Sequence, residues 1–342
     1  MAIEPLANVP LSPPAPEDLY FSESQNAWIL SRHRDVLAAL RSADLSQARP
    51  PKTATDTNAK PAGEKVHSEI HIPLLSSHTS KWQTEINWLA SALLQPLFAN
   101  RPVDLVAEFI RPWCLDSAIA LTGINPIHSA RLARLVSHLS ESDAAPHDAA
   151  AKSRATEANQ KLDQFFLWSS ASYEKSLFLG IAQTVPAFLA SAWAALLQHP
   201  AEWKILQTHP DWIPKATEEL LRYAGPVHSL FRQADRETSI CGTRIAAGDR
   251  LILRLASANR DAQQFAEPDR LDIRRGATGH LALSSGFHYC SGASLVRMMT
   301  ATATESILAR YSESKLSNSF EWSCGTMLIW PSSLPVLPGR VV

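Results

Sequence analysis

One cysteine stands between two glycines immediately before a long helical pattern, and this arrangement constrains the chain more than any other feature. Residues 286–292 read Gly-Phe-His-Tyr-Cys-Ser-Gly, and a pattern of helical type continues over 293–310. Gly286 and Gly292 allow tight turns and close approach to a flat, bulky group. The helix start directs free N–H groups and a positive dipole end toward the sulfur, so we expect a lowered pKa for Cys290. Such a thiolate is a nucleophile or a metal ligand, and a buried structural cysteine is the plainer alternative.

The wider motif resembles the cysteine loop of the cytochrome P450 family, in which the cysteine is the proximal ligand of heme iron. The residues at the family's spacing are Gly286, His288, Cys290, Gly292, Leu295 and Arg297. The match departs at Leu283 and Ser284, where the family usually has a Phe-Gly pair. The resemblance implies heme b (iron protoporphyrin IX) as cofactor, with Cys290 as the metal ligand and both glycines in the cofactor loop.

Composition and charge argue against several other classes of protein. The chain has 342 residues and a formal net charge of −1, so no electrostatic feature favours nucleic acid or an anionic membrane as a partner. Its 4 cysteines lie far apart, which argues against zinc and disulfide frameworks and favours a reducing cytosol. Residues 1–16 have neither a basic start nor an apolar core, so we expect no signal peptide. The sequence therefore predicts a cytoplasmic protein.

One apolar stretch imitates a membrane span. Residues 176–201 contain no Asp, Glu, Lys or Arg, and their number is sufficient to cross a bilayer. Polar residues and a proline interrupt the stretch, and no basic cluster flanks it. A helix buried inside a large soluble protein is therefore the better interpretation.

The order of apolar patterns predicts a mainly α fold with a small β region, and the resemblance implies the cytochrome P450 fold in a single domain, 1–342. Residues 1–25 and about 47–62 are expected to be irregular, the second as a mobile loop over a cavity mouth or as disordered chain. The predicted helices are 34–41, 79–100, 103–122, 129–141, 153–168, 176–198, 201–207 and 214–223. The predicted strands are 27–31, 227–233, 238–240, 243–245 and 250–255, with a further β region at 320–336.

The central helix carries the candidate catalytic residues. By resemblance, the family's A-G-x-[DE]-T segment falls on Gly-Ile-Ala-Gln-Thr at 180–184. Thr184 takes the place of the catalytic alcohol, and its hydroxyl can bond the Gly180 carbonyl. Pro186 removes the N–H donor that the Ala182 carbonyl would accept, so we expect a bulged helix. A helix kinked only for packing is the alternative.

Two residues of this segment depart from the family. Gln183 replaces the acid, and an amide cannot relay a proton as a carboxylate does. Ile181 replaces a glycine and crowds the space above the iron. The distance from His78 to this helix is also a few dozen residues shorter than in the family, which implies a reduced lid over the substrate cavity.

Further residues are assigned to the cofactor by resemblance. Arg232 and His288 are expected to contact the heme propionates. His78 stands where the family has a histidine on the helix that crosses the heme edge. Trp82 stands where the family usually has an arginine, and it either donates its indole N–H or belongs to the core.

A buried ion network is expected beneath the heme. Glu219 and Arg222 lie at i, i+3 on one helical face, and Arg270 follows at the spacing of the family's third member. A carboxylate between two guanidiniums tolerates burial better than a lysine version would. These three residues are assigned to structure and not to chemistry.

The resemblance implies a heme-thiolate monooxygenase that inserts one oxygen atom of O2 into a small apolar substrate, with Thr184 and Gln183 as catalytic residues. Ferredoxin and ferredoxin reductase are the candidate electron donors, although helix 79–100 offers only Lys81 as a cation for docking. A peroxide-using or non-oxygenating heme-thiolate enzyme, or a heme-binding protein without turnover, is the alternative. The candidate substrate pocket residues are Ile181, Val227, Leu230 and Met327.

Overall fold

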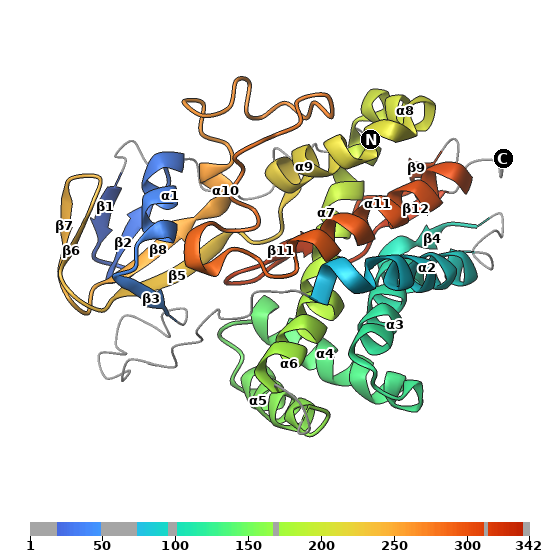
Figure 1. Cartoon of the computed structure of the whole chain (residues 1–342), viewed down its shortest axis with the longest axis horizontal. Helices are drawn as coiled ribbons and strands as arrows, with labels where there is room; N and C mark the ends of the chain where they lie inside the picture. The colour runs from blue at the N-terminus through green and yellow to red at the C-terminus, as the bar shows by residue number, and fades with distance from the viewer. Residues whose placement is uncertain (1–18, 49–73, 95–100, 167–170, 311–313, 338–342) are drawn as a thin grey trace.

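A large helical part and a smaller β-rich part make up the protein (Figure 1). The computed structural model describes residues 19–48, 74–94, 101–166, 171–310 and 314–337. The main hydrophobic core lies in the helical part, and it is assembled around the C-terminal half of the central helix, Val185–Gln198. Twelve successive residues of that half, 185–196, are buried, which explains why the sequence carries no charge there.

Five strands form the largest sheet, and in spatial order they are β1 (Leu19–Ser22), β2 (Ala27–Leu30), β8 (Arg250–Arg254), β5 (Ser229–Ala234) and β3 (Leu45–Gln47). β2 and β8 run parallel, and the other neighbours are antiparallel. The edge strand β3 pairs with β5 so that Gln47 stands opposite Arg232. The smaller strands are β4 (Val103–Asp104), β6 (Thr238–Ile240), β7 (Thr243–Ile245), β9 (Lys315–Leu316), β10 (Trp322–Cys324), β11 (Ile329–Pro331) and β12 (Pro335–Leu337).

The helices fill the rest of the described chain (Figure 1). They are α1 (His33–Arg41), α2 (Leu74–Leu94), α3 (Arg111–Thr122), α4 (Ser129–Ala144), α5 (Ala149–Asp163), α6 (Ala171–Leu179), α7 (Val185–Gln198), α8 (Pro200–Thr208), α9 (Ile213–Ala224), α10 (Leu255–Ala258) and α11 (Ala293–Arg310). α4 and α5 pack closely on each other, and α2 packs on α11.

The central helix is interrupted by a bulge at the predicted place. α6 and α7 are joined by a π-helical turn, Gly180–Thr184, in which the Val185 N–H donates to the Gly180 carbonyl five residues earlier. Pro186 has no N–H, so the α-helical ladder cannot continue through this point. In the described residues one helix, Tyr173–Gln198, is long and apolar enough to cross a membrane, and 72% of its apolar window is buried inside the protein. That burial fits the expected core helix.

The predicted fold class is confirmed, with shifts at the ends of elements. The helix predicted at 79–100 is α2, and residues 95–100 lie outside the described part. The helix predicted at 153–168 is α5, which begins at Ala149 because the Asp148 carboxylate accepts the first free N–H groups. The prediction of irregular chain over 1–25 is wrong at Leu19–Ser22.

Residues 19–22 form a strand because they are the first arm of a β-hairpin with β2. Leu19 pairs with Leu30 and Ser22 with Ala27, and the Phe21 ring packs edge-on against Trp28 at 5.4 Å between centroids. Asn26 closes the turn with a φ of 45°, a conformation that asparagine tolerates. The irregular segment predicted at 47–62 begins inside β3, and residues 49–73 lie outside the described part.

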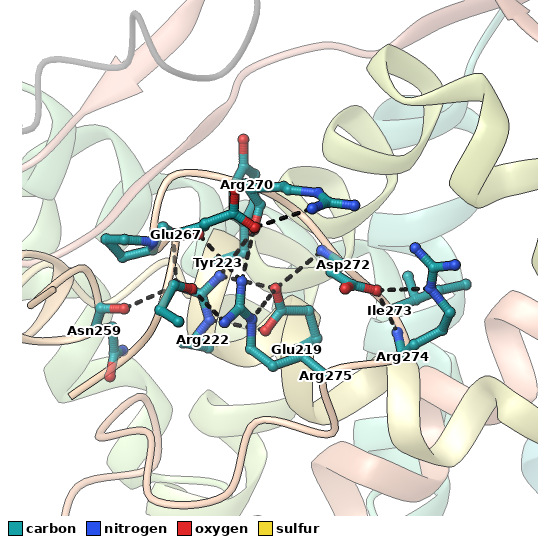
Figure 2. A network of polar contacts seen from close by, with 12 residues as sticks. Glu219, Arg222, Tyr223, Asn259, Glu267, Arg270, Asp272, Ile273, Arg274 and Arg275 are labelled. Atoms are coloured by element: carbon teal, nitrogen blue, oxygen red, sulfur yellow. Dashed lines mark hydrogen bonds and ion pairs between the residues drawn. The ribbon is translucent and has the colours of Figure 1, made fainter.

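A buried ion pair joins α9 to the irregular segment after α10 (Figure 2). Arg222 donates from Nε and Nη2 to the two carboxylate oxygens of Glu219, both at 2.8 Å, and both side chains are fully buried. The Nη1 group of Arg222 donates to the carbonyls of Asn259 at 2.9 Å and Pro268 at 2.8 Å. Charge-assisted bonds thus fix a segment that has no helix or strand of its own.

The third member of this network, after Glu219 and Arg222, is Arg275, so the prediction of Arg270 is wrong. Arg275 donates from Nε to Glu219 at 3.2 Å. The Arg270 guanidinium pairs with Glu267 at an exposed position, and only the Arg270 carbonyl enters the network, where it accepts from Arg222 (Figure 2). The Arg270 N–H donates to the Glu267 carbonyl in a tight turn, and in this turn the Arg270 side chain lies on the solvent side.

The two arginines provide a matched test of the network. We expect Arg275→Ala to lower the free energy of unfolding by about 3–5 kcal/mol, because it leaves part of a buried carboxylate charge unpaired. Arg270→Ala should change it by less than about 1 kcal/mol, since an exposed ion pair contributes little. Urea denaturation of both variants measures the difference, and equal losses would contradict the assignment.

Candidate functional site

The cysteine loop passes so close to α1 that only glycine fits at Gly286. Its φ is 67°, and a Cβ there would lie 2.7 Å from the Leu40 carbonyl oxygen and 2.9 Å from the Arg41 Cα. Gly286 therefore allows the cysteine loop to pass close to α1, and it does not line the cavity described below. Gly292 does line it, and a Cβ there would lie 3.9 Å from the Cys290 sulfur.

Burial raises the pKa of the Cys290 thiol, against the lowering expected from the sequence. The Gly292 N–H and the charge of Arg297 act in the opposite direction but do not outweigh burial. The Cys290 backbone is fixed, since its N–H donates to the Leu283 carbonyl at 2.9 Å and its carbonyl accepts from Ala293 at 3.1 Å. A buried sulfur that holds its proton becomes a thiolate when a metal cation displaces that proton.

An ion pair ties the helix after the cysteine to α9. Arg297 donates to the Glu218 carboxylate from Nε at 2.6 Å and from Nη2 at 2.9 Å, and from Nη1 to the Tyr289 hydroxyl at 3.3 Å. Burial acts to raise the pKa of Glu218, but the hydrogen bonds from Arg297 and His280 prevail and lower it to about 2. Arg297 thus links Tyr289, the residue before Cys290, and helix α11 to Glu218 of α9.

The cysteine loop and the π-helical turn line one cavity of about 380 Å³. This volume lies within the range of cofactor and ligand pockets, roughly 300–1,000 Å³. The predicted site residues that line this cavity are Ile181, Thr184, Val227, Leu230, Arg232, His288, Cys290, Gly292 and Met327. Segments far apart in the sequence therefore contribute to a single space.

Among the predicted residues whose side chains are described, Gln183 is not brought to this cavity. Gln183 lines a separate cavity on another face of the central helix. His78 belongs to α2, but its side chain lies outside the described part, and its role stays a prediction. Trp82 is partly buried and packs against the main core, which fits the core alternative.

The hydroxyl of Thr184 is not used within the helix. The Gly180 carbonyl, its expected acceptor, receives the Val185 N–H instead. Within the described part of the chain no hydrogen bond engages the Thr184 hydroxyl. The hydroxyl therefore remains for a ligand or a water in the cavity.

Arg232 is a buried cation that lacks a carboxylate partner among the described residues. Its side chain is 97% buried, and its Nη1 group donates to the Phe231 carbonyl at 2.9 Å. Burial lowers the pKa of Arg232 to about 10. Burial and the charge of Arg232 also lower the pKa of His288. These two side chains share a cavity wall that would be stabilised by an anion.

Sequence reasoning missed Gln47. Its side-chain nitrogen lies 3.2 Å from His288 Nδ1, and it lines the cavity beside Arg232, its partner across β3 and β5. The sequence gives no signal for this role, because Gln47 stands at the start of a stretch without apolar periodicity. Only strand pairing brings it to the site.

A hairpin turn carries Met327 into the cavity. The His228 N–H donates to the Met327 carbonyl at 2.8 Å, and Leu328 pairs with Val227 in an isolated bridge. On the outer side of this turn, a Cβ at Gly325 would overlap the Asp143 carboxylate. Burial raises the pKa of Asp143, although N–H groups of residues 326–328 act to lower it. Sequence reasoning also missed this contact between α4 and the turn.

Comparisons with known proteins identify the family. A model of the cytochrome P450 family matches residues 212–333. Nocardicin C N-oxygenase of Nocardia uniformis subsp. tsuyamanensis is 27% identical over an alignment of 358 residues, which covers 91% of this chain and 89% of that protein. The biotin biosynthesis cytochrome P450 of Bacillus subtilis (strain 168) is 37% identical over 148 residues, or 43% of this chain and 37% of that protein. Residues 212–333 belong to the cytochrome P450 family, and most of the chain aligns with curated P450 relatives.

Solved P450 structures share its fold. The structure of P450BioI in complex with hexadec-9Z-enoic acid ligated acyl carrier protein has a TM-score of 0.84 at 21% identity, and it covers 94% of this chain and 95% of that one. CYP109E1 from Bacillus megaterium in complex with testosterone has a TM-score of 0.81 at 18% identity, with 94% and 95% covered. This P450 is therefore an oxidoreductase of the monooxygenase type, with heme as its cofactor.

The residues of the cavity fit heme. Cys290 supplies a sulfur donor, and Arg232 with His288 supplies the charge and hydrogen bonds that two propionates require. The orphaned charge of Arg232 is the decisive feature, because a protein interior rarely holds a buried guanidinium without an anion. Apolar side chains on the remaining walls suit the ring.

Replacing the sulfur tests the metal ligand. We expect Cys290→Ser to lose the strongly red-shifted Soret band of the reduced carbonyl complex, because a serine oxygen does not replace a thiolate in donating to iron. Cys324→Ser, at an exposed cysteine, is the control and should keep the band. A band that survives in the Cys290 variant would show that another residue binds iron.

Replacing Arg232 tests the propionate site. We expect Arg232→Gln to weaken heme binding roughly tenfold to a hundredfold, since a hydrogen bond to a charged group contributes about 1.5–3 kcal/mol. The heme-free variant should be as stable as the parent or more stable, because a buried and unpaired charge has been removed. Arg244→Gln, at an exposed arginine, is the control. Unchanged heme affinity, measured by heme transfer to apomyoglobin, would refute the assignment.

Proposed function

We propose that this P450 inserts one oxygen atom of O2 into a small apolar substrate. The observation that carries the proposal is one cavity lined both by Cys290 and by the π-helical turn with its unengaged Thr184 hydroxyl. Ile181, Val227 and Met327 give this cavity an apolar wall.

The charges of the lining favour an uncharged substrate. Among the residues that line the cavity, Arg232 carries the cationic group, His288 is a base with a lowered pKa, and none is Asp, Glu or Lys. The heme propionates would use both side chains. A charged substrate would then lie in an apolar space without a counterion, which is energetically costly.

Heme bound through Cys290 supplies the activation of dioxygen, and the thiolate ligand favours cleavage of the oxygen–oxygen bond. The chain's own residues hold the reacting groups in place and keep bulk water out. The Thr184 hydroxyl is the candidate hydrogen-bond donor to a bound ligand or water, because it lines the cavity and makes no hydrogen bond within the helix. The π-helical turn widens the helix at this point and leaves backbone carbonyls available to water.

Proton supply is the weak step of this proposal. Gln183 cannot gain and lose a proton near neutral pH, and it faces the other cavity. Ile181 is buried in the first cavity and takes up room that a water chain would need. We therefore expect part of the reducing equivalents to be lost as hydrogen peroxide.

The same two residues favour a second candidate function. An enzyme that uses peroxide needs no proton relay for dioxygen activation, so Gln183 and Ile181 would not limit it. Peroxide-driven turnover without a reductase would support this candidate. Turnover only with a reductase would support the monooxygenase.

We further propose a single-domain, cytoplasmic enzyme that receives electrons from a ferredoxin and its reductase, as bacterial P450s generally do. Residues 82–94 of α2 carry Glu85 and no Lys or Arg. We therefore expect weak salt dependence of docking through this helix, because few charges would be paired. No feature of composition favours nucleic acid or membrane as a partner.

A substitution at Gln183 tests proton supply. We expect Gln183→Glu to raise the fraction of NADPH that appears as product, because a carboxyl group adjacent to Thr184 in the chain can exchange protons with the second cavity, which an amide cannot do. Gln183→Met, which removes the amide without adding an acid, is the control and should not improve coupling. Thr184→Ala should increase peroxide release. Tight coupling of NADPH consumption to product formation in the parent enzyme would contradict this account of the central helix.

A further inference from the structure

A second cavity lies on another face of the central helix. It measures about 520 Å³ and is bounded by α3, α4, the π-helical turn and β11. α3 and α4 both pack against this turn, and α3 also lies beside α6 (Figure 1). The two cavities have no lining residue in common: Ile181 and Thr184 face the first, and Ala182 and Gln183 face the second. The second cavity is thus a separate space of ligand size.

Two arginines border this cavity without a carboxylate partner in the described part of the chain. Arg111 begins α3 and Arg134 lies on α4, and both residues are exposed to solvent. Asp104 is the carboxylate whose charge acts on Arg111, but its Oδ1 atom already accepts the N–H groups of Val106 and Leu334. Both guanidiniums are therefore available for an anion.

The acid that lines the cavity offsets these charges only in part. Asp116 accepts a hydrogen bond from the Ser129 hydroxyl at 3.4 Å, and burial raises the pKa of its carboxyl group. No other lining residue is Asp or Glu. Two guanidiniums against one carboxyl group leave a net positive charge of about one, which is matched by a monoanion.

The inner wall of the cavity is apolar. Trp330, Leu328 and Ala187 line it and form a small buried cluster outside the main core. Pro186 and Leu115 extend this surface. A ligand that pairs with the arginines would therefore also need an apolar body to cover this wall.

We propose that this cavity binds an amphipathic carboxylate, whose carboxyl group pairs with Arg111 and Arg134 and whose apolar body lies against Trp330 and Leu328. The guanidinium fork matches a carboxylate with two parallel hydrogen bonds, which a hydroxyl group of the same size does not reproduce. The site is independent of the iron chemistry in the first cavity. Its test therefore stands even if the monooxygenase proposal fails.

Calorimetric titration with octanoate tests this site on the heme-loaded protein, with imidazole saturating the iron so that the first cavity is blocked. Octanoate should still bind, and 1-octanol should bind more weakly. In the double variant Arg111→Gln/Arg134→Gln, the octanoate Kd should rise roughly tenfold or more, while the octanol Kd stays the same. Arg131→Gln, on the same helix but outside the lining, is the matched control.

A second variant separates this cavity from any other site of fatty-acid binding. Ala133→Trp fills the cavity from its solvent side and should abolish octanoate binding while the heme spectrum is unchanged. Binding that is lost on imidazole saturation, or that survives both the double variant and Ala133→Trp, would overturn the proposal.

Discussion

The buried pair of Arg222 and Glu219 fixes the part of the chain that has the least structure of its own. Residues 259–285 contain no helix or strand, yet they lead directly into the cysteine loop. The guanidinium of Arg222 donates to three carbonyls of this segment, those of Asn259, Pro268 and Arg270. Arg275 donates to the same carboxylate, that of Glu219. Neutral side chains at this place would not supply so many directed bonds. The position of the cysteine therefore depends on charges that lie beside it and take no part in chemistry.

The π-helical turn then organises the functional space. Ile181 and Thr184, three residues apart, lie on one face of the helix and line one cavity, whereas Gln183 lines the other. The amide that replaces the family's acid is thus adjacent to a solvent-accessible space bordered by arginines and not to the cofactor.

The sequence predicted the parts that depend on local chemistry. A proline after a threonine in an apolar helix predicted the bulge at Gly180–Thr184, and the Glu-x-x-Arg spacing predicted the buried pair of Glu219 and Arg222. The role of Cys290 as the iron ligand stays a prediction. The sequence-based prediction failed where the backbone course of an irregular segment determines which side chain reaches a partner. Arg270 and Arg275 are alike in type, and only the turn at Glu267 determines which of them reaches Glu219. Gln47 and Asp143 reach their partners through strand pairing and helix packing, which no local pattern encodes. The pKa of Cys290 was predicted in the wrong direction because burial cannot be read from a single loop.

X-ray absorption at the iron edge of the purified ferric protein tests the central claim most directly, that a single thiolate from the cysteine loop binds heme iron. The account predicts one sulfur in the first coordination shell together with the porphyrin nitrogens, and it predicts that this sulfur persists when the three other cysteines, Cys114, Cys241 and Cys324, are replaced by serine. A first shell of nitrogen and oxygen alone, or a sulfur signal that vanishes in the triple variant, would contradict it.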